Sequence, residues 1–105
     1  MTTFDDRETA FEAKFAHDEE MRFRAVARRN RLLGLWAAGL LGKAGDAAAD
    51  YATEVVRADF QEAGDEDVVR KLVADLGGRA DASAIRAQMQ ACLAEARRQL
   101  LDEAR

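Results

Sequence analysis

The stretch GDEDVVRKLVADLGGRAD (residues 64–81) holds one complete helix together with its start and its end. After the leading glycine, Asp65 can cap the helix, and more acidic residues occupy the first turn, where the helix dipole is positive. Valine and leucine then recur at helical spacing until Gly77 ends the helix. Asp81 or Ser83 can cap the helix that follows. The stretch therefore predicts a short amphipathic helix, a tight glycine turn and the start of another helix.

Breaks of the same kind divide the rest of the chain. A first long helix is predicted to end at Gly42–Asp46, Asp46 can cap a second helix over residues 47–63, and the last helix covers residues 82–104. The sequence has no proline and is rich in residues that favour helices. It lacks the sustained alternation that marks strands. The predicted fold class is all-α: a four-helix bundle with short loops, preceded by a mobile N-terminal segment.

Each predicted helix carries an apolar stripe at helical spacing, which we expect to face the core of the bundle. The stripes of the first and second helices are Met21, Ala25, Leu32 and Trp36, and Tyr51, Ala52, Val55, Val56 and Phe60. Those of the third and fourth are Val69, Leu72, Val73 and Leu76, and Ile85, Met89, Cys92, Leu93, Ala96 and Leu100.

Composition narrows the class of protein. The 105 residues suffice for one small domain, and 20 acidic against 16 basic residues give a net charge of −4, which argues against binding to nucleic acid or to an anionic membrane. No apolar run approaches the roughly 18 residues of a membrane span, so we expect no membrane insertion. The single cysteine, Cys92, cannot form an internal disulfide, as is usual in a reducing cytosol.

The charge changes sign near residue 20. Residues 1–20 carry seven acids against two basic residues, whereas residues 21–31 carry five arginines and no acid. The apolar pattern changes at the same place. Because each residue turns a helix by about 100°, Phe4, Phe11 and Phe15 share a stripe that leads to Arg22 and Arg29, about 70° away from the stripe of Met21 and Trp36. These two changes predict a boundary between a detachable segment, residues 1–20, and a bundle, residues 21–105.

The N-terminal segment is expected to be marginal on its own. Thr3 and Asp6 resemble a capping box, so the segment can become helical, but helices this short are rarely stable in water. Burying three phenylalanines contributes roughly 1.5–3 kcal/mol each, while ordering the backbone costs about 1–2 kcal/mol per residue. We therefore expect disorder or fraying in the free protein and a helix once a partner receives the phenylalanines. The alternative is that they fold back on the bundle as ordinary core.

Two neighbouring stretches form a specific combination of motifs: TTFDDRETAFEAKF (residues 2–15) and FAHDEEMRFRAVARRNRLLGLWAA (residues 15–38). On these residues the sequence resembles the zeta subunit of the alpha-proteobacterial F-type ATP synthase, a natural inhibitor of ATP hydrolysis. The similarity extends over nearly the whole chain and includes the YA and DEDV neighbourhoods of the second and third helices. The resemblance implies a four-helix bundle preceded by a mobile inhibitory segment, here about residues 1–19.

The resemblance also implies a mechanism and a partner. In that family the segment inserts as a helix at a catalytic interface of the ATPase head, touches the central stalk and blocks rotation in the hydrolytic direction. The protein would then be cytoplasmic, peripheral to the inner membrane through the ATP synthase, and a monomer when free. The expected contact residues combine the phenylalanines with charged neighbours able to form ion pairs: Phe4, Asp5, Asp6, Arg7, Glu8, Phe11, Glu12, Lys14 and Phe15.

Other readings of the sequence have less support. His17 lies beside acids that favour its charged form, but an ordinary solvent-facing histidine is the simpler interpretation. The arginines of residues 21–31 are expected to pair with acids on neighbouring helices or to help dock the bundle, and no aromatic platform for nucleic acid accompanies them. With one histidine, one cysteine and one serine on separate elements, we expect no enzyme, no cofactor and no metal site. The remaining alternative is a helical adaptor that presents the same N-terminal helix to another partner.

Overall fold

The computed structural model describes residues 18–59 and 64–104, and these residues form four α helices and no strand. The helices are α2 (Glu19–Leu40), α3 (Gly45–Ala58), α4 (Glu66–Leu76) and α5 (Ala82–Glu103), with a 3-10 turn η1 (Gly77–Arg79) between α4 and α5. The predicted all-α class and the predicted number of helices are confirmed. The predicted mobile segment and Phe60 lie outside the described residues.

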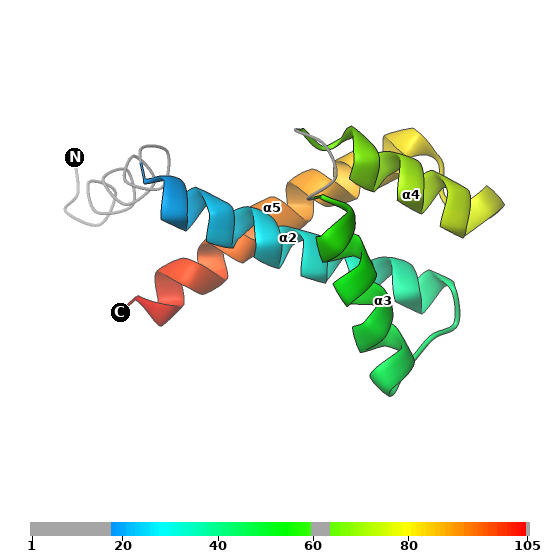
Figure 1. The fold of residues 1–105 in the computed structure, drawn as a ribbon, viewed down its shortest axis with the longest axis horizontal. Coiled ribbons are helices and arrows are strands. Elements are labelled where there is room, and N and C mark those ends of the chain that lie inside the picture. The colour runs from blue at the N-terminus through cyan, green and yellow to red at the C-terminus, as the bar shows by residue number, and fades with distance from the viewer. Residues whose placement is uncertain (1–17, 60–63, 105) are drawn as a thin grey trace.

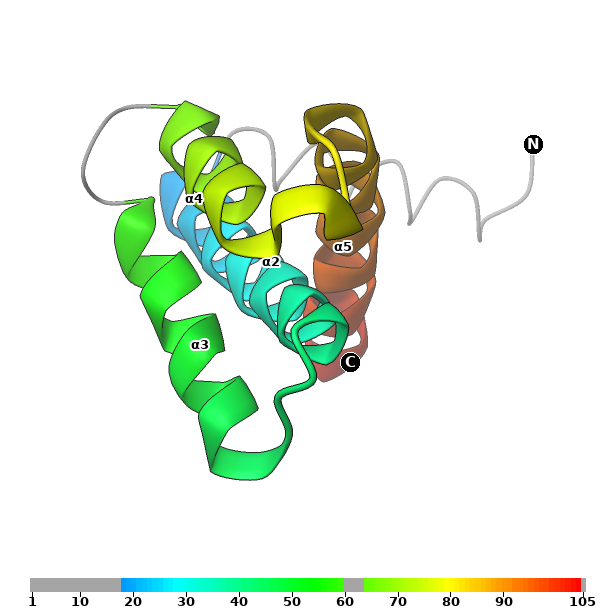
Figure 2. The ribbon, with the colours of Figure 1, turned by 90° about the vertical axis from the view of Figure 1, so that its right-hand side faces the viewer.

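The two long helices, α2 and α5, lie against each other, while the shorter α3 and α4 gather around one end of this pair (Figure 1). The start of α2 and the end of α5 extend together beyond α3 and α4 (Figure 1). Viewed from the end, α2 lies between α3 and α5 and contacts both of them (Figure 2). The arrangement therefore covers the C-terminal half of α2 more completely than its N-terminal half.

The helix starts agree with the sequence in one case and differ in two. Asp81 caps α5, since its carboxylate accepts a hydrogen bond from the backbone N–H of Ala84 at 2.8 Å. The cap predicted at Asp46 is wrong: α3 begins at Gly45, where a φ of +58° turns the chain one residue earlier. Asp65 does occupy the N-cap position of α4, but its carboxylate is used in a contact with Arg29.

Most of the predicted core is buried. The confirmed positions are Ala25, Tyr51, Ala52, Val55, Val69, Leu72, Leu76, Ile85, Met89, Cys92, Ala96 and Leu100. The face of α4 is rotated from the prediction, because Val68 is fully buried while Val73 is 39% exposed. In α2, Leu33, Ala37 and Ala38 are fully buried, whereas Leu32 and Trp36 only pack against the edge of the core. The other partly buried members of the predicted stripes are Met21, Val56 and Leu93.

Gly34 sets the distance between α2 and α3. A Cβ added at Gly34 would lie 2.6 Å from the Cα of Ala52 and 3.2 Å from its Cβ. Ala52 is itself fully buried, so the two helix backbones approach each other through the smallest residues available. A side chain at this position would therefore force the backbones apart.

We expect Gly34→Ala to lower the free energy of unfolding by about 1–3 kcal/mol, because the extra methyl meets backbone that cannot move aside. The matched control is Gly39→Ala in the same helix, where an added Cβ meets nothing within 4 Å. That control should raise stability by about 0.4–1 kcal/mol, as alanine favours a helix more than glycine does. Urea denaturation of both variants checks this, and equal effects would contradict the close approach.

A polar cluster links α3 to α4. The Tyr51 hydroxyl donates a hydrogen bond to Asp75 at 2.8 Å, and the Lys71 ammonium donates to the same carboxylate at 2.9 Å. The Lys71 ammonium also lies 5.1 Å from the centre of the Tyr51 ring. Although partial burial opposes ionisation, these two hydrogen bonds hold the pKa of Asp75 below its usual value. The ionised carboxylate therefore favours the folded state.

The stabilisation from Asp75 is expected to depend on pH. Because the pKa of Asp75 is lower in the folded state, its contribution is present above the unfolded pKa of about 4 and is lost as the pH falls through the folded pKa. Asp75→Asn should therefore be less stable than the wild type at neutral pH, with the difference shrinking in acid. Urea midpoints measured across this range check the trend. Asp50→Asn, at an exposed position of α3, should show no such convergence.

Candidate functional site

The nine predicted contact residues lie between positions 4 and 15, outside the described residues, so they stay predictions. The structure does describe the place where this segment joins the bundle. Asp18 has extended backbone angles (φ −98°, ψ 107°), and its carboxylate accepts a hydrogen bond from the backbone N–H of Met21 at 3.2 Å. Helix α2 then begins at Glu19, and acids at positions 19 and 20 occupy its positive end.

This cap was missed at the sequence level, although its signal is present. An aspartate followed by two glutamates ahead of an apolar stripe is a common helix start. In HDEEM these acids also stand beside His17, which lies outside the described residues. The cap indicates that the regular helix starts two residues before the predicted boundary at residue 21, while the domain boundary itself stays a prediction.

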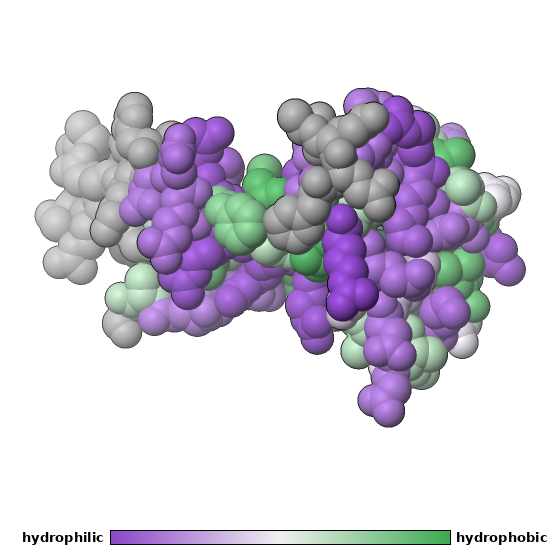
Figure 3. All heavy atoms as spheres, viewed as in Figure 1, coloured by the Kyte–Doolittle hydropathy of each residue, from purple (hydrophilic) through white to green (hydrophobic). Residues whose placement is uncertain are grey.

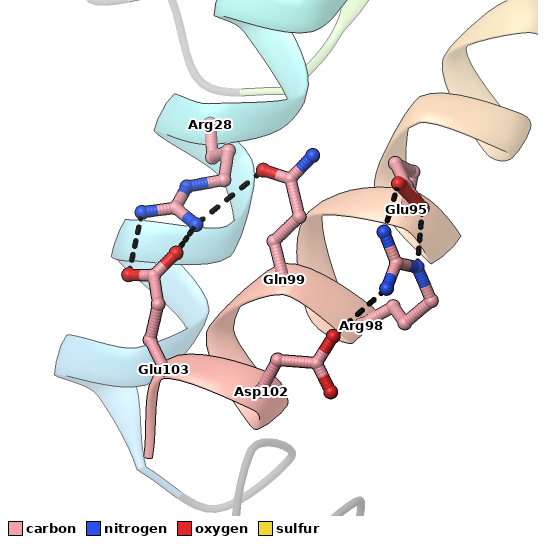
Figure 4. Close-up of polar contacts among 6 residues, drawn as sticks. All are labelled: Arg28, Glu95, Arg98, Gln99, Asp102 and Glu103. Atoms are coloured by element: carbon pink, nitrogen blue, oxygen red, sulfur yellow. Dashed lines mark hydrogen bonds and ion pairs between the residues drawn. The ribbon is translucent and has the colours of Figure 1, made fainter. Parts of the chain in front are cut away.

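Arg28 joins the start of α2 to the end of α5 (Figure 4). Its guanidinium forms a two-pronged ion pair with Glu103, in which one hydrogen bond measures 3.0 Å, and also donates to the side-chain oxygen of Gln99 at 3.4 Å. The hydrogen bond from Arg28 lowers the pKa of Glu103. On the outer side of α5, Arg98 pairs with Glu95 and Asp102 of its own helix (Figure 4). The pairing of Arg28 confirms part of the role expected for the arginine run.

Arg29 is buried, with only 4% of its surface exposed. Its guanidinium donates to Asp65 at 2.9 Å and to the side-chain oxygen of Asn30 at 2.8 and 3.1 Å. Asp59 lies 4.0 Å away, so two acids flank this one cation. The interaction ties α2 to the end of α3 and to the start of α4.

The burial of Arg29 corrects the helical projection. Arg29 and Leu33 are both buried, although neither belongs to the stripe predicted for this helix. The physical reason is that α2 is covered from several sides, which makes its buried face wider than one apolar stripe. The phenylalanine stripe itself lies outside the described residues and stays a prediction.

Hollows lie on both sides of the N-terminal half of α2. A cavity of about 210 Å³ opens between α2, α4 and α5, and its lining residues are Arg29, Asp65, Arg86, Met89, Gln90 and Leu93. On the side of α3, a hollow of only about 20 Å³ lies beside Phe23, whose surface is 58% exposed. Hydrophilic residues otherwise dominate the surface over the start of α2 (Figure 3). The start of α2 is therefore a polar surface interrupted by one exposed ring and one larger cavity.

We expect Arg29→Met to lower the free energy of unfolding by about 1–3 kcal/mol, because the buried side-chain oxygen of Asn30 loses both of its donors. The matched control is Arg86→Met, which removes an exposed ion pair with Glu66 and should change stability far less. Denaturant unfolding of the two variants gives the comparison. Equal losses would mean that the buried network contributes no more than a surface pair.

Within residues 18–59 and 64–104, no group of three or more His, Cys, Asp or Glu side chains could hold a metal ion. Over the same residues, no helix is long and apolar enough to cross a membrane. The contacts of Arg28 and Arg29 join the middle of α2 to α5 and to the start of α4.

Comparison with known proteins gives a consistent result. A family model described as ATPase inhibitor subunit zeta matches residues 1–99. A solved chain, described as a solution NMR structure, is 54% identical in sequence and superposes with a TM-score of 0.74; the match covers 79% of this chain and 98% of that chain. No match was found among curated proteins. Since the family model spans almost the entire sequence, the chain belongs to the ATPase inhibitor subunit zeta family.

Proposed function

We propose that this protein inhibits ATP hydrolysis by the F-type ATP synthase by inserting residues 1–20 as a helix into a catalytic interface of the ATPase head. The inserted segment also contacts the central stalk and blocks rotation in the hydrolytic direction. The observation that carries this proposal is the family match, which runs from residue 1 to residue 99 and so includes every predicted contact residue. A family of inhibitor subunits acts by binding, and the protein is accordingly proposed to be regulatory rather than catalytic.

The composition of the segment suits such a role. Phe4, Phe11 and Phe15 provide the apolar surface that an inserted helix buries, at roughly 1.5–3 kcal/mol each. The charged residues between them can form ion pairs with the walls of the cleft: Asp5, Asp6, Arg7, Glu8, Glu12 and Lys14. In binding of this kind, the partner supplies the apolar contacts that a short helix lacks on its own.

The described helices support the division into an inserted segment and a folded bundle. Within residues 18–59 and 64–104, one core of buried residues runs through α2, α3, α4 and α5. Arg28 and Arg29 hold the middle of α2 against α5 and α4. The segment is attached at Asp18, where the side-chain cap marks the start of α2.

The partners and location follow from this assignment. The protein is proposed to bind the catalytic head and the central stalk, and to reside in the cytoplasm beside the inner membrane through the ATP synthase. The free protein is proposed to be a monomer, because residues of all four described helices form one buried core within the bundle.

Replacing Phe4, Phe11 and Phe15 together by serine is expected to abolish inhibition of ATP hydrolysis, because each lost ring weakens binding by about tenfold or more. The measurement is the hydrolysis rate of isolated ATPase titrated with the full chain. Circular dichroism should show the bundle intact, since its core is built from residues 25 onward.

The matched control for this variant is Leu40→Ser, which removes an exposed apolar side chain at the far end of α2. It should inhibit at the same concentration as the wild type. Undiminished inhibition by the triple variant would mean that the phenylalanines are not the inserted surface, and the assignment of residues 1–20 would then be wrong.

A further inference from the structure

The cavity between α2, α4 and α5 combines an apolar floor with charged walls. Met89 and Leu93 of α5 supply the floor, and the walls carry Arg29, which is paired with Asp65, and Arg86, which is paired with Glu66. Its volume of about 210 Å³ is sufficient for a phenyl ring, since a closed cavity of about 150 Å³ holds benzene.

The basic charge that is not used in ion pairs lies beside the cavity, on the exposed surfaces of α2 and α5. Arg22 precedes Arg29 by seven positions and so lies on nearly the same face of α2, and Arg97 follows Leu93 by four positions on α5. Both arginines are exposed, and neither forms an ion pair with another residue in the ranges 18–59 and 64–104. The cavity and the surface that carries these two arginines are together called here the α2–α5 groove.

We propose that in the free protein residues 1–17 fold back onto the α2–α5 groove, with the Phe11 ring in the cavity and nearby carboxylates beside Arg22 and Arg97. The charges are complementary, because residues 1–17 contain four acids, Asp5, Asp6, Glu8 and Glu12, against two basic residues, Arg7 and Lys14. The residue types also match. The segment places carboxylates near its phenylalanines, and the groove places arginines near an apolar floor.

The length of the segment permits this contact. Phe11 precedes Asp18 by seven residues, and an extended chain of that length reaches about 23–25 Å. Arg29 follows Asp18 by eleven residues of helix, which corresponds to about 16 Å along the axis of α2. Phe15, only three residues from Asp18, reaches about 10 Å and cannot enter the same cavity. Phe4 reaches the cavity as well, but the shorter chain between Phe11 and Asp18 loses less entropy on closing, which favours Phe11 as the occupant.

The hollow on the opposite side of α2 is a poorer receiver. It is lined by Phe23, Val26, Ala27, Asn30, Val56 and Asp59, and its volume of about 20 Å³ holds little more than one water molecule. It also lacks an arginine to receive a carboxylate. We therefore expect the segment to rest on the α5 side of α2 and not on its α3 side.

The folded-back state has a consequence that rests on the proposed function. If the segment occupies the groove for part of the time, only the remaining fraction can enter the ATPase, and the apparent dissociation constant rises by the inverse of that fraction. The contact is largely between exposed charges, so added salt weakens it. The groove would then act as an internal competitor of the ATPase cleft.

The test uses the isolated full chain, labelled with ¹⁵N and carrying Cys92→Ala and Ala13→Cys, with a nitroxide on the introduced thiol. The amide signals of Gln90 and Leu93 are expected to lose intensity compared with the reduced label. The amide of Val56, which lies across α2 from the groove, should keep its intensity. High salt should restore the two groove signals.

A matched pair of variants separates the groove from general charge effects. Arg22→Glu should restore the signals of Gln90 and Leu93, whereas Arg31→Glu should not, since nine helical positions place Arg31 on the opposite face of α2. Equal effects of the two variants, or equal signal loss at Val56, would overturn the proposal. So would signal loss in a mixture of isotope-labelled chains and separate nitroxide-labelled chains, because the contact would then be with a second copy.

The readout is independent of the proposed inhibition. The nitroxide measurement requires no ATPase, whereas inhibition is read from the hydrolysis rate. If the groove signals do not respond and the chain still inhibits, the folded-back state alone is wrong. If they respond and the chain does not inhibit, the proposed function alone is wrong.

Discussion

The burial of α2 against its neighbours is the interaction on which the rest of the structure depends. Gly34 and Ala52 allow α2 and α3 to approach so closely that even one added methyl group would meet the backbone. Leu33, Ala37 and Ala38 are fully buried on the same helix, and they form one core with residues of α3, α4 and α5. The small residues of α2 therefore determine how the other helices can be placed, because a larger side chain in this helix would change their spacing.

Arginine is used in two different ways along α2. Arg28 and Arg29 form ion pairs within the bundle, with Glu103 and Asp65 respectively. Arg22 and Arg31 are exposed. A run that reads as uniformly basic in the sequence is thus divided by the fold into structural and available charge. In the sequence, the available part directly follows a segment of opposite charge.

The sequence predicts the helices and the core of this protein better than it predicts individual contacts between distant residues. Glycine breaks and the absence of proline were enough to predict four helices, and helical spacing identified most of the core. The errors arose where a contact between distant residues overrides a local preference. Asp65 serves Arg29 rather than capping its own helix, and Arg29 is buried because two acids from other elements surround it. The exchange of Val73 for Val68 reflects the angle at which α4 meets its neighbours, which spacing within one helix does not encode. The predicted contact residues before position 18 rest on sequence and family alone.

The pairing of α2 with α5 also has a mechanical meaning. The start of α2 extends beyond α3 and α4, but it does so beside the end of α5, to which it is joined by Arg28 and by the packing of Ala25 on Leu100 (Figure 1). Two connected rods resist bending better than a single rod. A sideways load applied at Asp18 would consequently be shared by both helices and carried into the body of the protein, instead of flexing one isolated helix. Shortening the chain at its far end would weaken this brace, even though the missing residues lie some eighty positions away in the sequence.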